Sequence, residues 1–159
     1  MFEVSKKPYA RIFKKKKQAW MLSSADLINF PQGSLGHYLG EFLSNNKFEL
    51  IDKLESHDAF HVITGMSTAV RDEVGMQFLL LGNGKKSLYL FSTITICTVL
   101  LPEYFLHFIK CFRLGRRYKA IYKLDLKSEL NNQLSDIRWK LRKPRPARIK
   151  LFGHLNDFI

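Results

Sequence analysis

The uncharged run from Leu88 to Leu101 is the segment whose assignment most affects the predicted fold. Such residues can form a membrane span, a strand or a helix, and each choice leads to a different class of protein. A helix that crosses a bilayer needs about 20 apolar residues, whereas this run has fourteen, and its extension meets Glu103 and His107. Its many β-branched residues favour a strand, but a lone strand is not stable and no partner strand is evident elsewhere in the sequence. We therefore predict a helix over residues 86–100.

The other apolar residues recur mostly at helical spacing. Ser34 is a candidate N-cap, and the apolar residues after it follow the i, i+3, i+4, i+7 pattern of an amphipathic helix that ends near Asn46. Pro102 suits the first turn of a later helix, and the last helix must end before Pro144. With 159 residues, the chain is long enough to bury one hydrophobic core. We therefore predict an all-α single domain of six to eight helices.

Some helices and helix ends are predicted from only one to three residues. Phe48, Ile51 and Leu54 lie at helical spacing and predict a short helix. Gly115 is expected to close the helix that begins near Pro102. Asp125 is a candidate N-cap for a further helix after it.

Two imidazoles and two carboxylates between residues 57 and 73 form a candidate metal site. His57 and His61 are four residues apart, and Asp58 is three residues before His61, so one turn of a helix directs all three toward one point. Gly65 ends this helix and lets the chain turn back, so that Glu73 comes from a second helix. Nitrogen and oxygen donors suit zinc, and also iron or manganese.

The spacing alone leaves two interpretations equally open: a metal site, and a pair of histidines on a surface helix. The helix face that carries Glu73 is mostly apolar, so we expect this carboxylate to point inward, where a metal would neutralise a costly unpaired charge. Four tightly bound ligands would make the site structural, whereas a loosely bound Asp58 or Glu73 would leave a position for substrate or water. We interpret His37, His107 and His154 as structural or surface histidines.

A net charge of +12, from 26 Lys and Arg against 14 Asp and Glu, predicts an anionic partner: nucleic acid, acidic phospholipid or a phosphorylated ligand. Two basic segments, residues 1–21 and residues 143–159, flank the helical part. Tyr9, Phe13 and Trp20 lie at helical spacing among lysines, which fits a basic amphipathic helix at an anionic membrane surface and equally a solvated tail. Nucleic acid is the weakest of these partners, because the basic runs lie at the ends and zinc-finger spacing is absent.

The cysteines and the basic start of the chain both indicate an intracellular protein. Cys97 and Cys111 lie in apolar runs without the spacing of a disulfide framework, so we expect small, reduced core residues. The stretch from Lys6 to Lys17 lacks the apolar block that would follow it in a secretory signal.

The candidate metal ligands also carry a resemblance to a known family. The arrangement His-Asp-x-x-His, eleven residues, then Glu is similar to the signature of the ubiquinone (coenzyme Q) biosynthesis protein family Coq-four; His57, Asp58, His61 and Glu73 match it without a gap. Flanking segments resemble the family too, so the likeness extends over roughly residues 22–142. These segments are Gly33-Ser34-Leu35-Gly36, Gly115-Arg116-Arg117-Tyr118-Lys119-Ala120 and Leu134-Ser135-Asp136-Ile137-Arg138.

The resemblance implies an all-helical domain over residues 22–142, with zinc held by the four matched residues. It implies a peripheral membrane protein, on the cytoplasmic side of the inner membrane if bacterial, that binds the polyisoprenoid tail of a quinone precursor in a lipid-accommodating core. It also implies an oxidative decarboxylation at ring carbon 1, which replaces carboxyl by hydroxyl, and a role in organising other quinone-biosynthesis proteins.

Under this resemblance, Phe78, Phe105, Phe108 and Phe112 would line the apolar channel for the prenyl tail, although the same four residues also suit an ordinary packed core. The metal could act as a Lewis acid on a ring carboxylate or phenol. Three functions stay open: a metal-dependent enzyme acting on the prenylated ring, a non-catalytic isoprenoid-binding scaffold, and a nucleic-acid-binding helical protein. A homodimer is open as well.

Overall fold

The structure, a computed structural model, describes residues 19–52 and 54–144. Within this part of the chain it contains seven α-helices and, in place of a sheet, two isolated bridges, which confirms the predicted all-α single domain. The described helices lie within the predicted range 22–142, whereas Tyr9, Phe13 and His154 lie outside the described residues. The helices are α2 (Ser24–Ile28), α3 (Leu35–Asn46), α4 (Glu55–Thr64), α5 (Val70–Gly82), α6 (Leu88–Leu100), α7 (Phe105–Arg116) and α8 (Leu134–Leu141), with the short 3-10 helices η1 (Pro102–Tyr104) and η2 (Ile121–Lys123).

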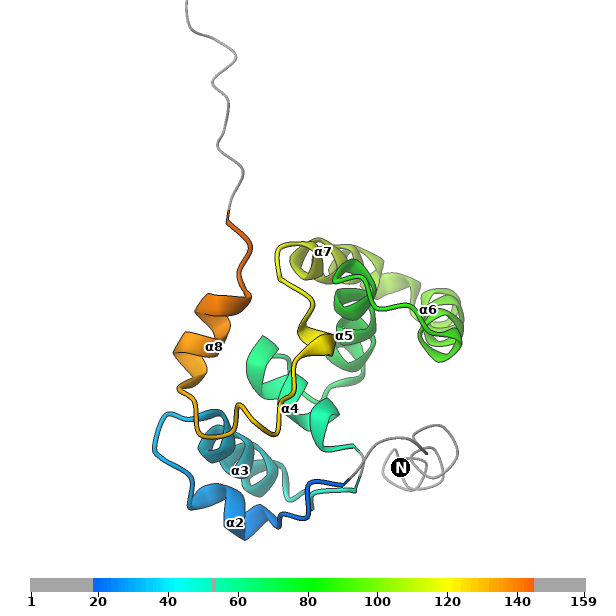
Figure 1. Cartoon of the computed structure of the whole chain (residues 1–159). Helices are drawn as coiled ribbons and strands as arrows, with labels where there is room; N and C mark the ends of the chain where they lie inside the picture. Colours follow the sequence, from blue (N-terminus) through cyan, green and yellow to red (C-terminus); the bar gives the residue numbers. More distant parts are fainter. Residues whose placement is uncertain (1–18, 53, 145–159) are drawn as a thin grey trace, which may run out of the picture.

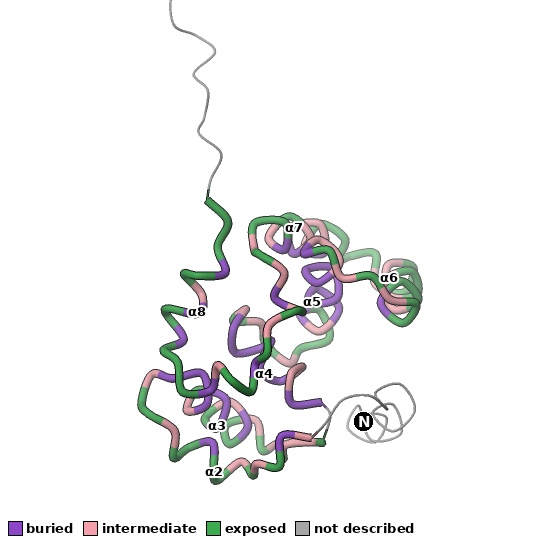
Figure 2. The backbone as a smooth tube through the Cα atoms, in the orientation of Figure 1, coloured by how far each residue is buried: buried purple, intermediate pink, exposed green. Residues whose placement is uncertain are grey.

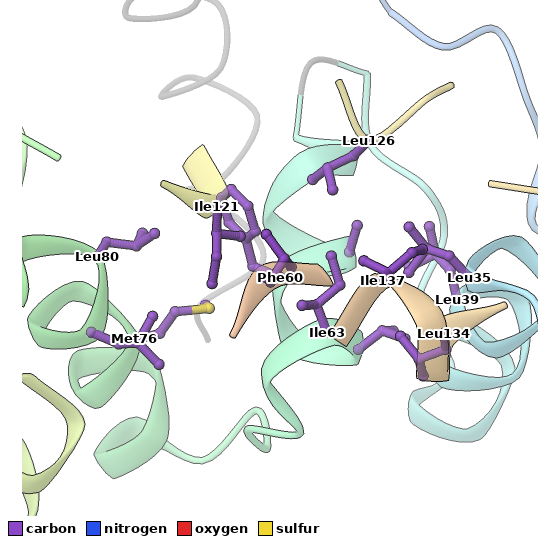
Figure 3. Packing of buried hydrophobic residues seen from close by; sticks show 14 of the residues in the cluster. Leu35, Leu39, Phe60, Ile63, Met76, Leu80, Ile121, Leu126, Leu134 and Ile137 are labelled. Carbon is purple, nitrogen blue, oxygen red and sulfur yellow. The ribbon is translucent and has the colours of Figure 1, made fainter. Parts of the chain in front are cut away.

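Helix α4 lies between two groups of helices (Figure 1). On one side, α2 packs on α3, and both α3 and α8 contact α4. On the other side, α5 packs along α7 and also contacts α6. Figure 3 shows that Phe60 of α4 has Met76 and Leu80 of α5 on one side and Leu35 and Leu39 of α3 on the other. The two groups therefore share one hydrophobic core.

The first turn of α3 is bonded to the segment that precedes α8. Ser34 caps α3, as predicted, because its hydroxyl accepts a hydrogen bond from a backbone N–H in the first turn. The Leu35 amide donates to the Asn132 carbonyl at 2.9 Å, and the Leu134 amide donates to the Gly33 carbonyl at 3.0 Å. These bonds join two segments that are about a hundred residues apart in the sequence.

Helices α5 and α7 approach each other closely at two glycines. A Cβ atom on Gly82 would overlap the backbone carbonyl of Phe112, and a Cβ atom on Gly115 would overlap the carbonyl of Leu79. Gly115, which the sequence predicts as a helix end, is the next-to-last residue of α7. Its missing side chain allows the close packing of two backbones.

Hydrogen bonds of the Asn83 side chain connect the segment after α7 to the end of α5. Asn83 is buried, and its Oδ1 accepts a hydrogen bond from the Ile121 amide at 2.8 Å. Its Nδ2 donates, over 2.7–3.2 Å, to three backbone carbonyls, which belong to Gly115, Tyr118 and Lys119. One side chain thus pairs with four backbone groups where the chain leaves α7.

Helix α6 is the helix predicted in the uncharged run, and it stands at the edge of the molecule (Figure 1). Ser87 caps it by accepting a hydrogen bond from the Leu90 amide at 3.2 Å. Of its 13 residues, all of them described, only Leu90 is buried, and Figure 2 shows the others exposed or half-buried. Among the described residues, no single helix has the length and apolarity to cross a membrane. Helix α6 and the segment Pro102–Arg116 together have sufficient length and apolarity, but the chain bends by 105° between them.

Two of the predicted helices are wrong. The described residues from 47 to 54 form no α-helix, because Lys47 takes a left-handed conformation with φ of 55° that ends α3. Phe48 then packs edge-on against Phe42. Asp125 caps no helix either, because its carboxylate accepts a hydrogen bond from the Lys127 amide at 3.2 Å within a series of turns.

Replacing Asn83 by Ala is expected to lower the free energy of unfolding by about 2–4 kcal/mol, because it leaves several buried backbone groups without partners. Urea denaturation followed by circular dichroism measures the change. Asn131→Ala, at an exposed position before α8, is the matched control and should change stability by less than about 0.5 kcal/mol. Equal effects of the two substitutions would contradict the role of Asn83.

Candidate metal site

The candidate metal site lies where α4 meets the first turn of α5. His57 and His61 are on one face of α4, and their ring centroids are 4.9 Å apart. Gly65 ends α4 in a left-handed conformation with φ of 71°, as predicted, and the chain turns back to bring in Glu73. Among the described residues, His57, His61 and Glu73 form one group whose possible ligand atoms all lie within 4.8 Å of one another.

The His61 ring is held so that one nitrogen faces the site. Its Nδ1 lies 3.1 Å from the carbonyl oxygen of Met66, and because a carbonyl can only accept, Nδ1 must carry the proton. In the neutral ring Nε2 therefore has a lone pair, and this atom lies 3.3 Å from Oε1 of Glu73. This Nε2 is the one buried side-chain nitrogen or oxygen among the described residues that lacks a hydrogen-bond partner. Phe42 stacks on the ring, with centroids 5.4 Å apart.

His57 faces the same carboxylate from the outer side. Its Nε2 lies 3.3 Å from Oε2 of Glu73, and its Nδ1 lies 3.4 Å from Oδ1 of Asp58. Asp58 is thus placed behind the His57 ring and is not in the group of three. A carboxylate in this position orients a metal-binding histidine. The prediction that Asp58 is itself a ligand stays a prediction.

The close charges shift two pKa values. Burial would raise the pKa of Glu73, but hydrogen bonds and charges from His57 and His61 outweigh it and lower this pKa to about 2. Burial would lower the pKa of His57, but the carboxylates of Asp58 and Glu73 outweigh it and raise this pKa above its usual value. The site therefore keeps Glu73 charged at neutral pH.

The three residues fit a divalent metal. Tetrahedral zinc holds nitrogen and oxygen donors about 2.0–2.2 Å away, which places neighbouring donors roughly 3.4 Å apart. The 3.3 Å separations between Glu73 oxygens and the Nε2 atoms of His57 and His61 are close to that spacing. Two imidazoles and a carboxylate suit zinc, and also iron or manganese.

A second polar cluster, formed by Asp72, His107 and Cys111, joins α5 to α7 beside this site. His107, which we interpret from the sequence as a structural or surface histidine, has its Nε2 3.1 Å from Oδ1 of Asp72 and 3.5 Å from Sγ of Cys111. Burial would raise the pKa of Asp72, but hydrogen bonds from Ser67 and Arg71 outweigh it and lower this pKa. Burial raises the pKa of Cys111, so its thiol stays protonated. No local sequence signal connects residues 35 positions apart.

The four phenylalanines predicted to line a prenyl channel have different surroundings. Phe78 and Phe108 are buried and stack on each other, with ring centroids 4.9 Å apart, in the core between α5 and α7. Phe112 is half-buried and Phe105 is 44% exposed. None of the four lines either of two surface pockets, whose volumes are about 660 and 540 Å³. Their role in holding a prenyl tail stays a prediction.

Comparison with known protein families and with curated proteins finds no match. Among solved structures, the chain is similar to a protein from Nostoc punctiforme that is named a candidate ubiquinone biosynthesis protein. The two share 20% sequence identity and a TM-score of 0.62, over 88% of this chain and 80% of that chain. At this level of identity, the likeness shows that the two proteins have the same fold.

In the metal-free protein, the stability that Glu73 contributes is expected to depend on pH. Its pKa is lowered from 4.5 to about 2, so its contribution is present above pH 4.5 and is lost as pH falls through 2. The pKa of His57 is raised from 6.5, so its contribution is present below pH 6.5 and is lost as pH rises through the folded-state pKa. Glu73→Gln should therefore destabilise the protein most between pH 4.5 and 6.5.

Urea denaturation in the presence of a chelator, at about pH 5.5 and about pH 9, measures this difference. Glu41→Gln is the matched control, because Glu41 pairs with His37 at an exposed position and such pairs contribute at most about 1 kcal/mol. An effect of Glu73→Gln that is the same at both pH values would show that His57 and Glu73 are not coupled.

Proposed function

We propose that this protein binds a divalent metal, zinc foremost, through His57, His61 and Glu73. The observation that carries the proposal is the buried Nε2 of His61, which has no hydrogen-bond partner and lies 3.3 Å from Oε1 of the Glu73 carboxylate. When the His61 ring is neutral, two acceptors face each other there, an arrangement that a cation between them stabilises. The raised pKa of His57 agrees with this, because the carboxylates of Asp58 and Glu73 stabilise a positive charge at the same place.

The donor set favours a reactive site over a purely structural one. Two histidines and one glutamate are the protein ligands of zinc sites that keep a further position for water or substrate. With Asp58 behind His57, that position stays available, and the His57 and Glu73 side chains are 25% and 30% exposed, so a ligand can reach them. A bound metal supplies a Lewis acid for a substrate carboxylate or phenol oxygen. Met66 and Phe42 hold His61 in place.

We further propose that the protein acts in ubiquinone biosynthesis, on a prenylated quinone precursor. Two independent likenesses support this: the sequence motif resembles the Coq-four family, and the fold is that of a protein named a candidate ubiquinone biosynthesis protein. The reaction that we propose is the oxidative replacement of the carboxyl at ring carbon 1 by hydroxyl, with the ring carboxylate directed to the metal site. The carboxyl leaves as carbon dioxide, water supplies the hydroxyl oxygen, and an external two-electron acceptor such as dioxygen takes the electrons, since zinc is not redox-active. The second candidate is a non-catalytic isoprenoid-binding scaffold for the same pathway.

Purified protein is expected to bind about one zinc per chain, as measured by elemental analysis after dialysis and by calorimetric titration. His61→Ala should abolish this binding, because it removes the buried donor, and Asp58→Asn should weaken it about 10–100-fold by releasing the His57 ring. His37→Ala is the matched control, since His37 also sits on a helix four residues from a glutamate. A wild-type protein without metal affinity, or a His61→Ala variant that binds as tightly, would rule out the site.

The pathway is tested by expression in a bacterial strain that cannot replace the ring carbon-1 carboxyl and therefore lacks ubiquinone. The wild-type chain should restore ubiquinone, whereas His61→Ala should leave the carboxylated precursor, and mass spectrometry of extracted quinones distinguishes the two. If His61→Ala restores ubiquinone fully, the metal is not needed for the chemistry and the scaffold role is favoured. If the wild-type chain restores nothing, this role in ubiquinone biosynthesis is wrong.

A further inference from the structure

Helix α6 and the start of α7 expose an unusual amount of apolar side-chain surface. Of the large apolar residues that are exposed in the described chain, eight fall between residues 88 and 106, and three are at least 75% exposed. Scattered exposed apolar residues are ordinary, but a contiguous set marks a surface that is covered by something else. The eight are Leu88, Tyr89, Phe91, Ile96, Val99, Leu100, Phe105 and Leu106.

The two faces of α6 explain why this surface is not part of the core. One stripe, at helical spacing, packs inward and contains Leu90, Ile94, Cys97 and the following Leu101. The outer face is also apolar, with hydroxyls but without a charged residue, as the uncharged run requires. A helix that is apolar all round is suited to burial on every side, yet α6 packs mainly against α5 and η1.

The charges around this surface indicate what covers it. Lys86 is exposed immediately before α6, and Lys110, Arg113 and Arg116 are exposed along α7, against one exposed acidic residue between positions 86 and 116, Glu103. An anionic lipid surface offers an apolar interior together with negative headgroups, and each nearby basic residue strengthens the attraction. A second copy of this chain would offer an apolar face but, in a symmetric pair, would bring its own Lys86, Lys110, Arg113 and Arg116 toward the same basic residues. The charge pattern therefore favours lipid.

The length of α6 decides how it meets the lipid. At about 1.5 Å per residue its 13 residues span roughly 20 Å, less than the roughly 30 Å of a bilayer core. The chain then bends by 105° into the segment Pro102–Arg116, whose basic residues cannot follow into the lipid. Tyr89 and Phe91 are aromatic residues of the kind that gather at the membrane surface.

We propose that α6, together with Phe105 and Leu106, docks on the surface of an anionic membrane, with its axis in the membrane plane and its outer face in the lipid. This surface differs from the basic ends of the chain, where the sequence alone places membrane contact. It is also independent of the metal, because none of its residues belongs to the group formed by His57, His61 and Glu73.

The test is flotation of the full-length protein with phosphatidylcholine vesicles that do or do not contain phosphatidylglycerol. The wild-type chain should float with the anionic vesicles and should still do so with a chelator present. Combining Val99→Glu with Leu106→Glu, at two positions that are each 75% exposed, should lower the bound fraction at least about tenfold by opposing insertion of the apolar face. Trp139→Glu, at a 78% exposed residue on α8, is the matched control and should bind like the wild type.

The folded state of each variant is checked by circular dichroism and thermal unfolding, and its mass in solution by light scattering. Binding of the double variant equal to that of the wild type would assign the contact to the basic ends and overturn the proposal. A wild-type dimer that the double variant breaks into monomers would assign the surface to a second copy, which also overturns it. Binding of the wild type that is lost only with the chelator would instead tie membrane contact to the metal and overturn the independence.

Discussion

The close approach of α5 and α7 is the constraint on which the rest of the structure depends. Because Gly82 and Gly115 carry no side chains, the two backbones meet, and Asn83 then bonds the departing chain to the same place. The C-terminal end of α5 is thereby held on α7, and the contact between Asp72 and His107 holds its first turn, where Glu73 faces α4. The same packing leaves α6 at the margin, with one stripe in the core and its other side outward.

The candidate metal site joins the two groups of helices. His57 and His61 belong to α4, which packs on α3 and α8, whereas Glu73 belongs to α5, which packs on α6 and α7. A metal that binds all three residues adds its binding free energy to the folded state alone, since the unfolded chain offers no assembled site. A bound metal would therefore strengthen the contact between the two groups of helices. The shared core at Phe60 excludes water from one side of this contact.

The predictable features of this fold are those with short-range causes. The His57–His61 pair, the cap at Ser34 and the helix stop at Gly65 each follow from residues within one or two turns, and the structure has all three. Contacts between distant residues leave no such trace: Asp72 meets His107, and Asn83 meets Ile121, only because α7 lies on α5. The helix predicted after Asp125 fails for the opposite reason, since a local side-chain bond to the backbone favours a turn there.

The bonds between the first turn of α3 and the start of α8 have a consequence for how the chain assembles. The bridge between Ser34 and Gln133 closes a loop of about a hundred residues, whereas the metal donors from His57 to Glu73 lie within seventeen positions of the sequence. Since the entropy lost on closing a loop grows with its length, the donor group is the less costly of the two to bring together. The ligand set is therefore a local property of one helical hairpin, whereas the α3–α8 junction closes residues 34–133 into one long loop.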